Sequence, residues 1–183
     1  MTPITHRIGI AALASGLCVA AAALAQAQAP AAKLDDPTIV AIYDAANTWD
    51  IETSALAEKK SHNKDVLALA QTFARDHRAV RQEGRDLAKK LGVKPTPPKD
   101  PPLYADHLAA MKRLQAASGA AFDREYAQNE VTYHKAVIDA INTTLLPAIQ
   151  NAELKGLVTK VAPAFQGHLA AAEQLANKLP PTA

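Results

Sequence analysis

Three histidines occupy positions where a helical pattern calls for apolar residues. His77, His134 and His168 each fall in a run of apolar residues spaced three or four positions apart. Such spacing places a run on one side of a helix, and that side is buried. Each imidazole is therefore expected to point into a core, where a polar ring needs a partner. The runs are Val66, Ala70, Phe73, His77, Val80, Gly84, Leu87 and Leu91; Ala127, Val131, His134, Ile138, Ile141 and Leu145; and Leu154, Val158, Val161, Phe165, His168, Ala172, Leu175 and Leu179.

Two glutamates are the acidic candidates near these histidines. Glu130 lies one turn before His134 on the same side of its helix, and Glu52 falls in a further apolar run. Neutral imidazoles and carboxylates that converge inside a helical bundle are ligands for zinc, iron, manganese or copper. We therefore predict that one transition-metal ion binds between the three histidines and that Glu52 or Glu130 completes its coordination. The run around Glu52 consists of Ile39, Ile42, Ala46, Trp49, Glu52 and Leu56.

A structural role for the same residues is the alternative to metal binding. A buried imidazole can donate to a carbonyl or carboxylate and simply pack, and a buried Glu52 would supply such a partner. Di-iron bundles carry Glu-x-x-His pairs. These pairs are absent here, because the third residue before each histidine is Ala74, Val131 and Phe165. Di-iron redox chemistry is therefore disfavoured.

No motif in the sequence identifies an enzyme. Gly-rich phosphate loops, nucleophile elbows, His-Glu-x-x-His motifs and paired metal-binding cysteines are absent from the sequence. No residue is therefore assigned a catalytic role or an organic cofactor, and a hydrolase or nucleotide-dependent enzyme is disfavoured. His62 in a turn and His107 on a short helix are expected to be solvated and not to be ligands.

The composition indicates an all-helical domain that binds no nucleic acid. The 183 residues include only 7 Gly and 4% aromatic residues, and no convincing strand pattern occurs among them. The formal net charge is +2, which provides no electrostatic basis for binding nucleic acid or an anionic membrane surface. These features identify no protein partner.

Residues 1–27 have the features of a signal peptide that is removed after export. A basic start precedes an uncharged run from Ile8 to Ala25, and small residues at alternate positions near its end suit signal peptidase. We therefore predict a periplasmic or otherwise exported protein with a single mature domain, residues 28–183. Cleavage would leave no stable membrane insertion and would remove Cys18, the only cysteine. An uncleaved membrane anchor is the alternative.

The breaks between the expected helices favour a bundle with one long crossover. Residues 94–102 contain too many prolines for a helix. As an extended segment they would span about 28 Å, and the short helix that follows adds about 22 Å. This connector returns the chain to its starting end, so that the second and third long helices run parallel. The expected helices cover 36–60, 64–91, 103–117, 121–147 and 152–179, with a kink at Pro163.

That topology places the three histidines at one level of the bundle. His77 and His134 lie at similar distances from the starts of parallel helices, and His134 and His168 lie at similar distances from their shared turn. Glu52 is expected about 9 Å from that level, and Glu130 is displaced in the same direction. The predicted fold is therefore all-α, a ferritin-like four-helix bundle whose long crossover contains a Pro-rich segment and a short helix.

The helices carry four short motifs in a fixed order. They are Trp49-Asp-Ile-Glu52-Thr-Ser-Ala-Leu-Ala, Phe73-Ala-Arg-Asp-His77, Phe122-Asp123-Arg-Glu-Tyr126 followed by His134, and Ala162-Pro163 followed by His168-Leu169. Together they resemble the bacterial exported family called domain of unknown function 4142, over nearly the whole mature chain. The resemblance implies an uncharacterised, ferritin-like exported bundle with Glu52, His77, His134 and His168 at its characteristic polar positions. It implies no activity, and Tyr133 stands where many relatives place Asp.

Two functions are compatible with these features. One is an exported ferritin-like bundle that binds a transition metal through the buried His/Glu cluster. The other is a non-catalytic periplasmic module that binds a partner or supports envelope stress tolerance, with structural core histidines. The two differ in whether the purified protein holds a metal ion in fixed stoichiometry.

Overall fold

The computed structural model describes residues 34–181, which form helices and connecting loops without a strand. The predicted signal peptide lies outside these described residues. None of the helices described combines the length and apolar character needed to cross a bilayer. The helices are α1 (Asp36–Lys60), α2 (Lys64–Leu91), α3 (Tyr104–Ala116), α4 (Gly119–Ala140), the π-helix η1 (Ile141–Leu145), α5 (Leu146–Ala148) and α6 (Ala152–Lys178).

Side-chain caps and backbone conformation set most helix ends. The carboxylate of Asp35 accepts a hydrogen bond from the Thr38 amide at 2.9 Å and caps the start of α1. Asn63 and Asn151 cap α2 and α6 in the same way. Gly92 ends α2 in the left-handed region, at φ 65°, where a side chain would be strained. The sequence boundaries of the first, second and last long helices are correct to within about two residues, which is the usual ambiguity of helix ends.

The expected third long helix is not a continuous α-helix. It widens into the π-helix η1 before the short helix α5, which contains Pro147. Proline has no amide hydrogen, and its ring clashes with the carbonyl of the fourth residue before it, here Thr143. The wider π turn is an arrangement that relieves this clash. By contrast, α6 continues through Pro163.

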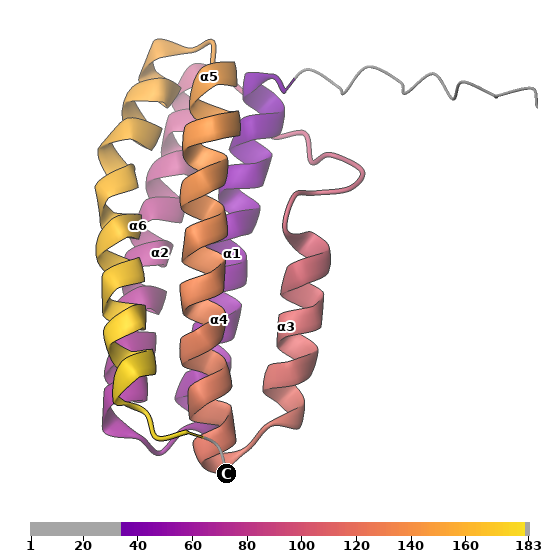
Figure 1. Ribbon diagram of the computed structural model, residues 1–183. Coiled ribbons are helices and arrows are strands. Elements are labelled where there is room, and N and C mark those ends of the chain that lie inside the picture. The colour runs from indigo at the N-terminus through magenta and orange to yellow at the C-terminus, as the bar shows by residue number, and fades with distance from the viewer. Residues whose placement is uncertain (1–33, 182–183) are drawn as a thin grey trace, which may run out of the picture. The chain divides into compact units, whose positions relative to one another are not determined.

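The four long helices form a bundle in which α2 and α4 run parallel, as predicted (Figure 1). At one end the Asp36 carboxylate accepts hydrogen bonds from the backbone amides of Gln150 and Asn151, at 2.9 and 2.8 Å. At the other end Ser61 donates to Asp123 at 2.5 Å. The start of α1 therefore lies beside the start of α6, and the end of α1 lies beside the start of α4.

In the crossover between α2 and α4, the helix α3 carries the chain back along the bundle, and the Pro-rich segment contributes little to this distance. The Thr96 amide donates to the Pro37 carbonyl at 3.1 Å, which holds the Pro-rich segment beside the beginning of α1. The helix α3 then runs back along the outside of α1 and α4 (Figure 1). Its far end is held by Lys60, whose ammonium donates to the carbonyls of Leu114 and Ala117 at 2.9 and 2.6 Å.

A layer of buried polar side chains separates two apolar clusters in the bundle. The first cluster lies near the start of α1 and includes Ile39, Val158 and Phe165. The second lies toward the end of α1 and includes Phe122 and Tyr126. Between them along the helices lie the buried residues Asn47, Asp50, Thr53, Ser54, His77, Glu130 and His134.

The close approach of α1 and α2 at Gly84 provides a test of the fold. A Cβ atom at residue 84 would lie 2.5 Å from Cε1 of Tyr43, whose buried ring is held by a hydrogen bond from its hydroxyl to the Val80 carbonyl. We expect Gly84→Ala to lower the free energy of unfolding by about 1–3 kcal/mol through overpacking. Gly156→Ala on α6 is the matched control, since a Cβ there meets nothing within 4 Å. It should raise stability by up to about 1 kcal/mol, and chemical denaturation would measure both changes. Equal effects of the two substitutions would contradict this packing.

Candidate metal centre

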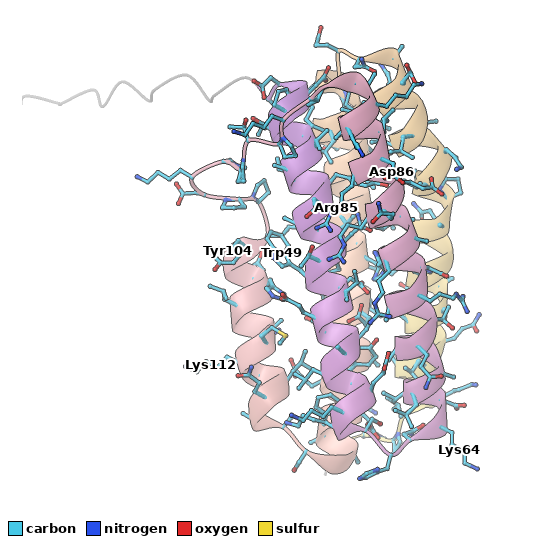
Figure 2. All side chains as sticks on the ribbon, turned by 180° about the vertical axis from the view of Figure 1, so that it is seen from behind. Trp49, Lys64, Arg85, Asp86, Tyr104 and Lys112 are labelled. Carbon is cyan, nitrogen blue, oxygen red and sulfur yellow. The ribbon has the colours of Figure 1, made fainter. Side chains whose placement is uncertain are left out.

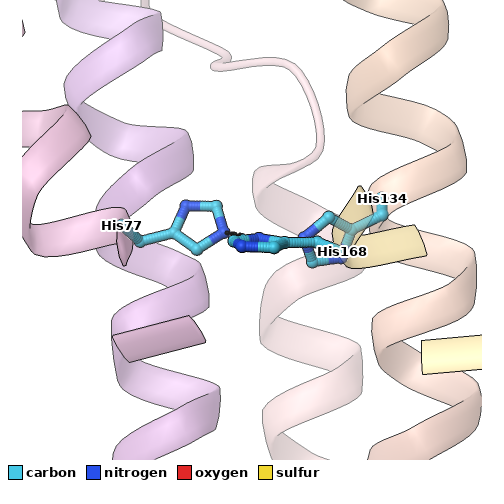
Figure 3. A group of neighbouring side chains, drawn as sticks. All are labelled: His77, His134 and His168. Carbon is cyan, nitrogen blue, oxygen red and sulfur yellow. Dashed lines mark hydrogen bonds between the residues drawn. The ribbon is translucent and has the colours of Figure 1, made fainter. Parts of the chain in front are cut away.

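The structure brings His77, His134 and His168 together from α2, α4 and α6 (Figure 3). One ring nitrogen from each lies within 4.8 Å of the others. His77 Nε2 and His168 Nδ1 lie 3.3 Å apart. His77 and His134 are 2% and 0% exposed, so the two rings are removed from water.

Hydrogen bonds fix which nitrogen of His77 and His134 carries the proton. The side-chain amide of Asn47 donates to the Tyr43 carbonyl at 2.8 Å, which turns its oxygen toward His77. That oxygen lies 2.9 Å from His77 Nδ1 and accepts a hydrogen bond from it, so Nδ1 carries the proton. His134 Nδ1 lies 2.9 Å from the carbonyl oxygen of Glu130, which likewise can only accept. In the neutral imidazole the other nitrogen, Nε2, then carries a lone pair.

In His168 the roles of the two ring nitrogens are exchanged. His168 Nε2 lies 3.2 Å from a carboxylate oxygen of Asp76, so the proton belongs on Nε2. The lone pair is on Nδ1, which faces His77 Nε2. Three lone pairs therefore converge on one point, with each proton directed outward. This arrangement suits a cation bound by all three rings.

Asp50 is the carboxylate closest to this point, and the sequence analysis did not identify it. Its Oδ2 atom lies 3.4 Å from His77 Nε2 and 3.7 Å from His134 Nε2. The side chain is fully buried, and Oδ2 has no hydrogen-bond partner within residues 34–181. Its other oxygen accepts from the Ser54 hydroxyl at 3.4 Å. Asp50 thus adds an oxygen to the three nitrogens.

Glu130 lies close to Asp50 and His134 and is fully buried. Its Oε1 accepts a hydrogen bond from the Thr53 hydroxyl at 3.1 Å, and its Oε2 lies 3.6 Å from His134 Nδ1. Burial raises the pKa of Asp50 well above its usual range, and the neighbouring Glu130 charge raises it further. Burial also raises the pKa of Glu130. In the metal-free protein the two carboxyl groups therefore retain protons that exposed carboxyls would lose.

The imidazoles shift in the opposite direction for the same physical reason. Burial lowers the pKa of His77 well below its usual value, and the charges of the other two histidines lower it further. Burial lowers the pKa of His134 to about 3, although its bond to the Glu130 carbonyl opposes the shift. Burial also lowers the pKa of His168, which the Asp76 carboxylate partly offsets. Neutral imidazoles are the form that binds metals.

The structure places Glu52 outside this cluster. Its side chain is 50% exposed, and Oε2 accepts a hydrogen bond at 2.9 Å from Nε2 of His107, which was expected to be solvated but is buried. The expectation that Glu52 faces the bundle interior is therefore wrong. The reason is that α3 covers a second side of α1, where Trp49 stacks on His107 with ring centroids 5.5 Å apart. Figure 2 shows Trp49 beside Tyr104 at the start of α3.

The lowered imidazole pKa values predict how the metal-free protein responds to pH. Below about pH 6.5 the unfolded chain takes up protons on these histidines, whereas folded His134 stays neutral until about pH 3. Stability should therefore fall as the pH decreases from about 6.5, by up to about 1.4 kcal/mol per pH unit for each such histidine. The raised carboxyl pKa values act oppositely, because the folded protein then holds the extra protons and loses stability as the pH rises.

Comparing variants isolates the contribution of one histidine to the pH dependence of stability. His134→Gln should reduce the fall in unfolding free energy between pH 6 and 5 by about 1 kcal/mol. The exposed His62 provides the control, and His62→Gln should leave this slope unchanged. Urea unfolding at each pH measures both. If the unfolding free energy of His134→Gln changes with pH as steeply as that of the parent protein, this imidazole is not held neutral by burial.

Comparisons with known proteins concern the whole bundle. No curated protein matches the chain in sequence. The fold is similar to the solved structure "CopM in the Cu(II)-bound form", with a TM-score of 0.62 and 16% sequence identity, over 80% of this chain and 100% of that chain. The family model described as "Domain of unknown function (DUF4142)" matches residues 21–175. This match confirms the resemblance noted in the motifs, and the chain belongs to the DUF4142 family.

Proposed function

We propose that this protein binds one divalent transition-metal ion through His77, His134, His168 and Asp50. One observation carries the proposal. In each of the three imidazoles the protonated nitrogen donates outward to an acceptor, so the nitrogen with the lone pair faces the other two rings. Without a cation these lone pairs repel one another in a region of low dielectric, where such repulsion is strong. A bound metal ion turns this repulsion into three coordinate bonds.

The distances between the donor atoms support a four-coordinate site. Two ligands at about 2.0–2.1 Å from one tetrahedral ion lie about 3.3 Å from each other. His77 Nε2 and His168 Nδ1 are 3.3 Å apart, and Asp50 Oδ2 lies 3.4 Å from His77 Nε2 and 3.7 Å from His134 Nε2. These three separations therefore lie within about 0.4 Å of the tetrahedral value.

Glu130 supports the ligands and is not a ligand in this proposal. It lies beside Asp50, and the contact between the two carboxyls raises the pKa of Asp50 and lowers that of Glu130, so Asp50 holds the shared proton in the metal-free protein. A bound ion would displace this proton, and Glu130 would then help to orient the Asp50 carboxylate. A separate second centre formed by Asp50, Glu130 and His134 is disfavoured, because His134 Nδ1 already donates to the Glu130 carbonyl.

The donor set favours Cu(II) or Zn(II) over Cu(I). Imidazole nitrogens and carboxylate oxygens suit borderline divalent ions, whereas Cu(I) prefers sulfur. Sulfur is scarce in this chain, which has one cysteine, inside the predicted signal peptide, and two methionines. CopM was solved with Cu(II) bound, so Cu(II) is the first ion to test here.

The same geometry favours a binding role over catalysis. Three nitrogens and one oxygen complete a tetrahedral shell and leave no position for a substrate, as in structural metal sites. The signal-peptide features of residues 1–27 support a location in the periplasm or another exported compartment. We therefore propose an exported protein that holds or buffers a transition metal.

Equilibrium titration tests the metal site. The metal-free protein, titrated with Cu(II) or Zn(II) against a competing chelator, should bind one ion per chain. His77→Gln and His134→Gln should each weaken binding by about 100-fold or more, which exceeds the usual effect of losing a supporting residue. His62→Gln, which alters an exposed turn histidine, should bind as the parent protein does. If neither ion binds, or if His134→Gln binds normally, the histidines are structural.

A second comparison tests which carboxylate is the ligand. Asp50 and Glu52 lie two residues apart on α1, but only Asp50 faces the histidine nitrogens. We expect Asp50→Asn to weaken Cu(II) binding by at least about tenfold and Glu52→Gln to leave it unchanged. The reverse pattern in the same chelator competition would restore the assignment of Glu52.

A further inference from the structure

The proposed metal ligands differ in how much of each side chain reaches solvent. The side chains of His77, His134 and Asp50 are 2%, 0% and 0% exposed. The side chain of His168 is 13% exposed, and Asp76, which holds it, is 35% exposed. One side of an otherwise enclosed site therefore faces outward, at the interface between α2 and α6.

A groove leads to this exposed ligand. It measures about 440 Å³ and runs between α2 and α6, with Thr72 and Phe73 on one side and Gly167, His168 and Ala171 on the other. Small residues keep the groove open beside the imidazole, since a Cβ atom at Gly167 would meet nothing within 4 Å. The buried Phe73 ring stacks on His168, with centroids 4.3 Å apart and planes inclined by 23°.

A cavity on the opposite side of the site is the rival route. It measures about 270 Å³, lies between α1, α3 and α4, and is lined by Asp50, Trp49 and Tyr133 but by none of the three metal-site histidines. An ion in this cavity would have to pass the buried Asp50 carboxylate and the Tyr133 ring to reach the nitrogens. The hydroxyl of Tyr133 donates to the Ala46 carbonyl at 2.7 Å, which holds that ring in place.

We infer that the metal ion enters and leaves through the groove between α2 and α6, with His168 as the exchanging ligand and Asp76 as its positioning residue. This inference rests on the proposed metal site. His168 has the freedom that exchange requires, because its ring borders the groove and its hydrogen-bonding side-chain partner, Asp76, is partly solvated. Rotation of the ring breaks its contact with Asp76 and turns Nδ1 toward the groove. The other three ligands keep their places.

Exchange kinetics of the full protein test the route. Cu(II) uptake is followed by quenching of Trp49, the only tryptophan, and release is followed after adding excess EDTA. Gly167→Leu narrows the groove, and we expect both rates to fall about fivefold or more with an unchanged Kd, because an obstruction raises the barrier in both directions. Gly156→Leu is the matched control, since it lies on the same side of α6, about 16 Å away, and also has open space.

Three further variants distinguish entry through this groove from entry through the rival cavity. Asp76→Ala should speed release by about tenfold because His168 loses its support, and Asp76→Asn should restore slow release because it keeps an acceptor oxygen. Ala109→Leu narrows the rival cavity and should exchange at the parental rate. The route is overturned if Gly167→Leu exchanges as fast as Gly156→Leu, or if Ala109→Leu is the slow variant. Absence of equilibrium Cu(II) binding in the parent protein overturns the metal site itself, and the route with it.

Discussion

The convergence of three unprotonated imidazole nitrogens in the middle of the bundle is the constraint on which the rest of the structure depends. Buried polar groups are costly unless they are paired. In this protein a layer of such groups interrupts the apolar core, and apolar clusters enclose it toward both ends of the bundle. Each helix of the bundle must therefore supply either a ligand or a support. The helix α1 supplies Asp50 and Asn47, whereas α2, α4 and α6 supply one histidine each.

The supports decide the chemistry of the layer because they determine where the protons lie. His77 donates to a side-chain amide, His134 to a main-chain carbonyl and His168 to a carboxylate. All three acceptors lie on the outer side of the rings, so no proton is directed between them. Most buried polar side-chain atoms in proteins have a hydrogen-bond partner. Here His134 Nε2 and Asp50 Oδ2 have no hydrogen-bond partner among residues 34–181, and they lie 3.7 Å apart.

The sequence predicted the histidine cluster and the helix directions, but not the carboxylate. Helical periodicity placed the three histidines inward, because α2, α4 and α6 each have a clear apolar run. The helix α1 is different, since α3 covers its second side and buries Trp49 there. Two stripes of residues on α1 are therefore buried. The more apolar stripe contains Glu52, which is why the sequence pattern predicted Glu52 as the inward carboxylate. The inward stripe contains Asn47, Asp50 and Ser54, with steps of three and four, but its polar composition resembles an exposed face.

The proposed metal site would also link metal binding to the stability of the bundle. A ligand that binds only the folded state stabilises it by about 2.7 kcal/mol when present at 100 times its Kd. Here the gain would arise at a layer that touches all four long helices, so one ion would hold together elements far apart in the sequence. Stable holding and exchange place opposite demands on such a site. The proposed site meets both demands, because His77, His134 and Asp50 are buried while His168 lies at a groove between two helices. In this proposal His168 alone opens, and the layer that the other three residues maintain stays folded.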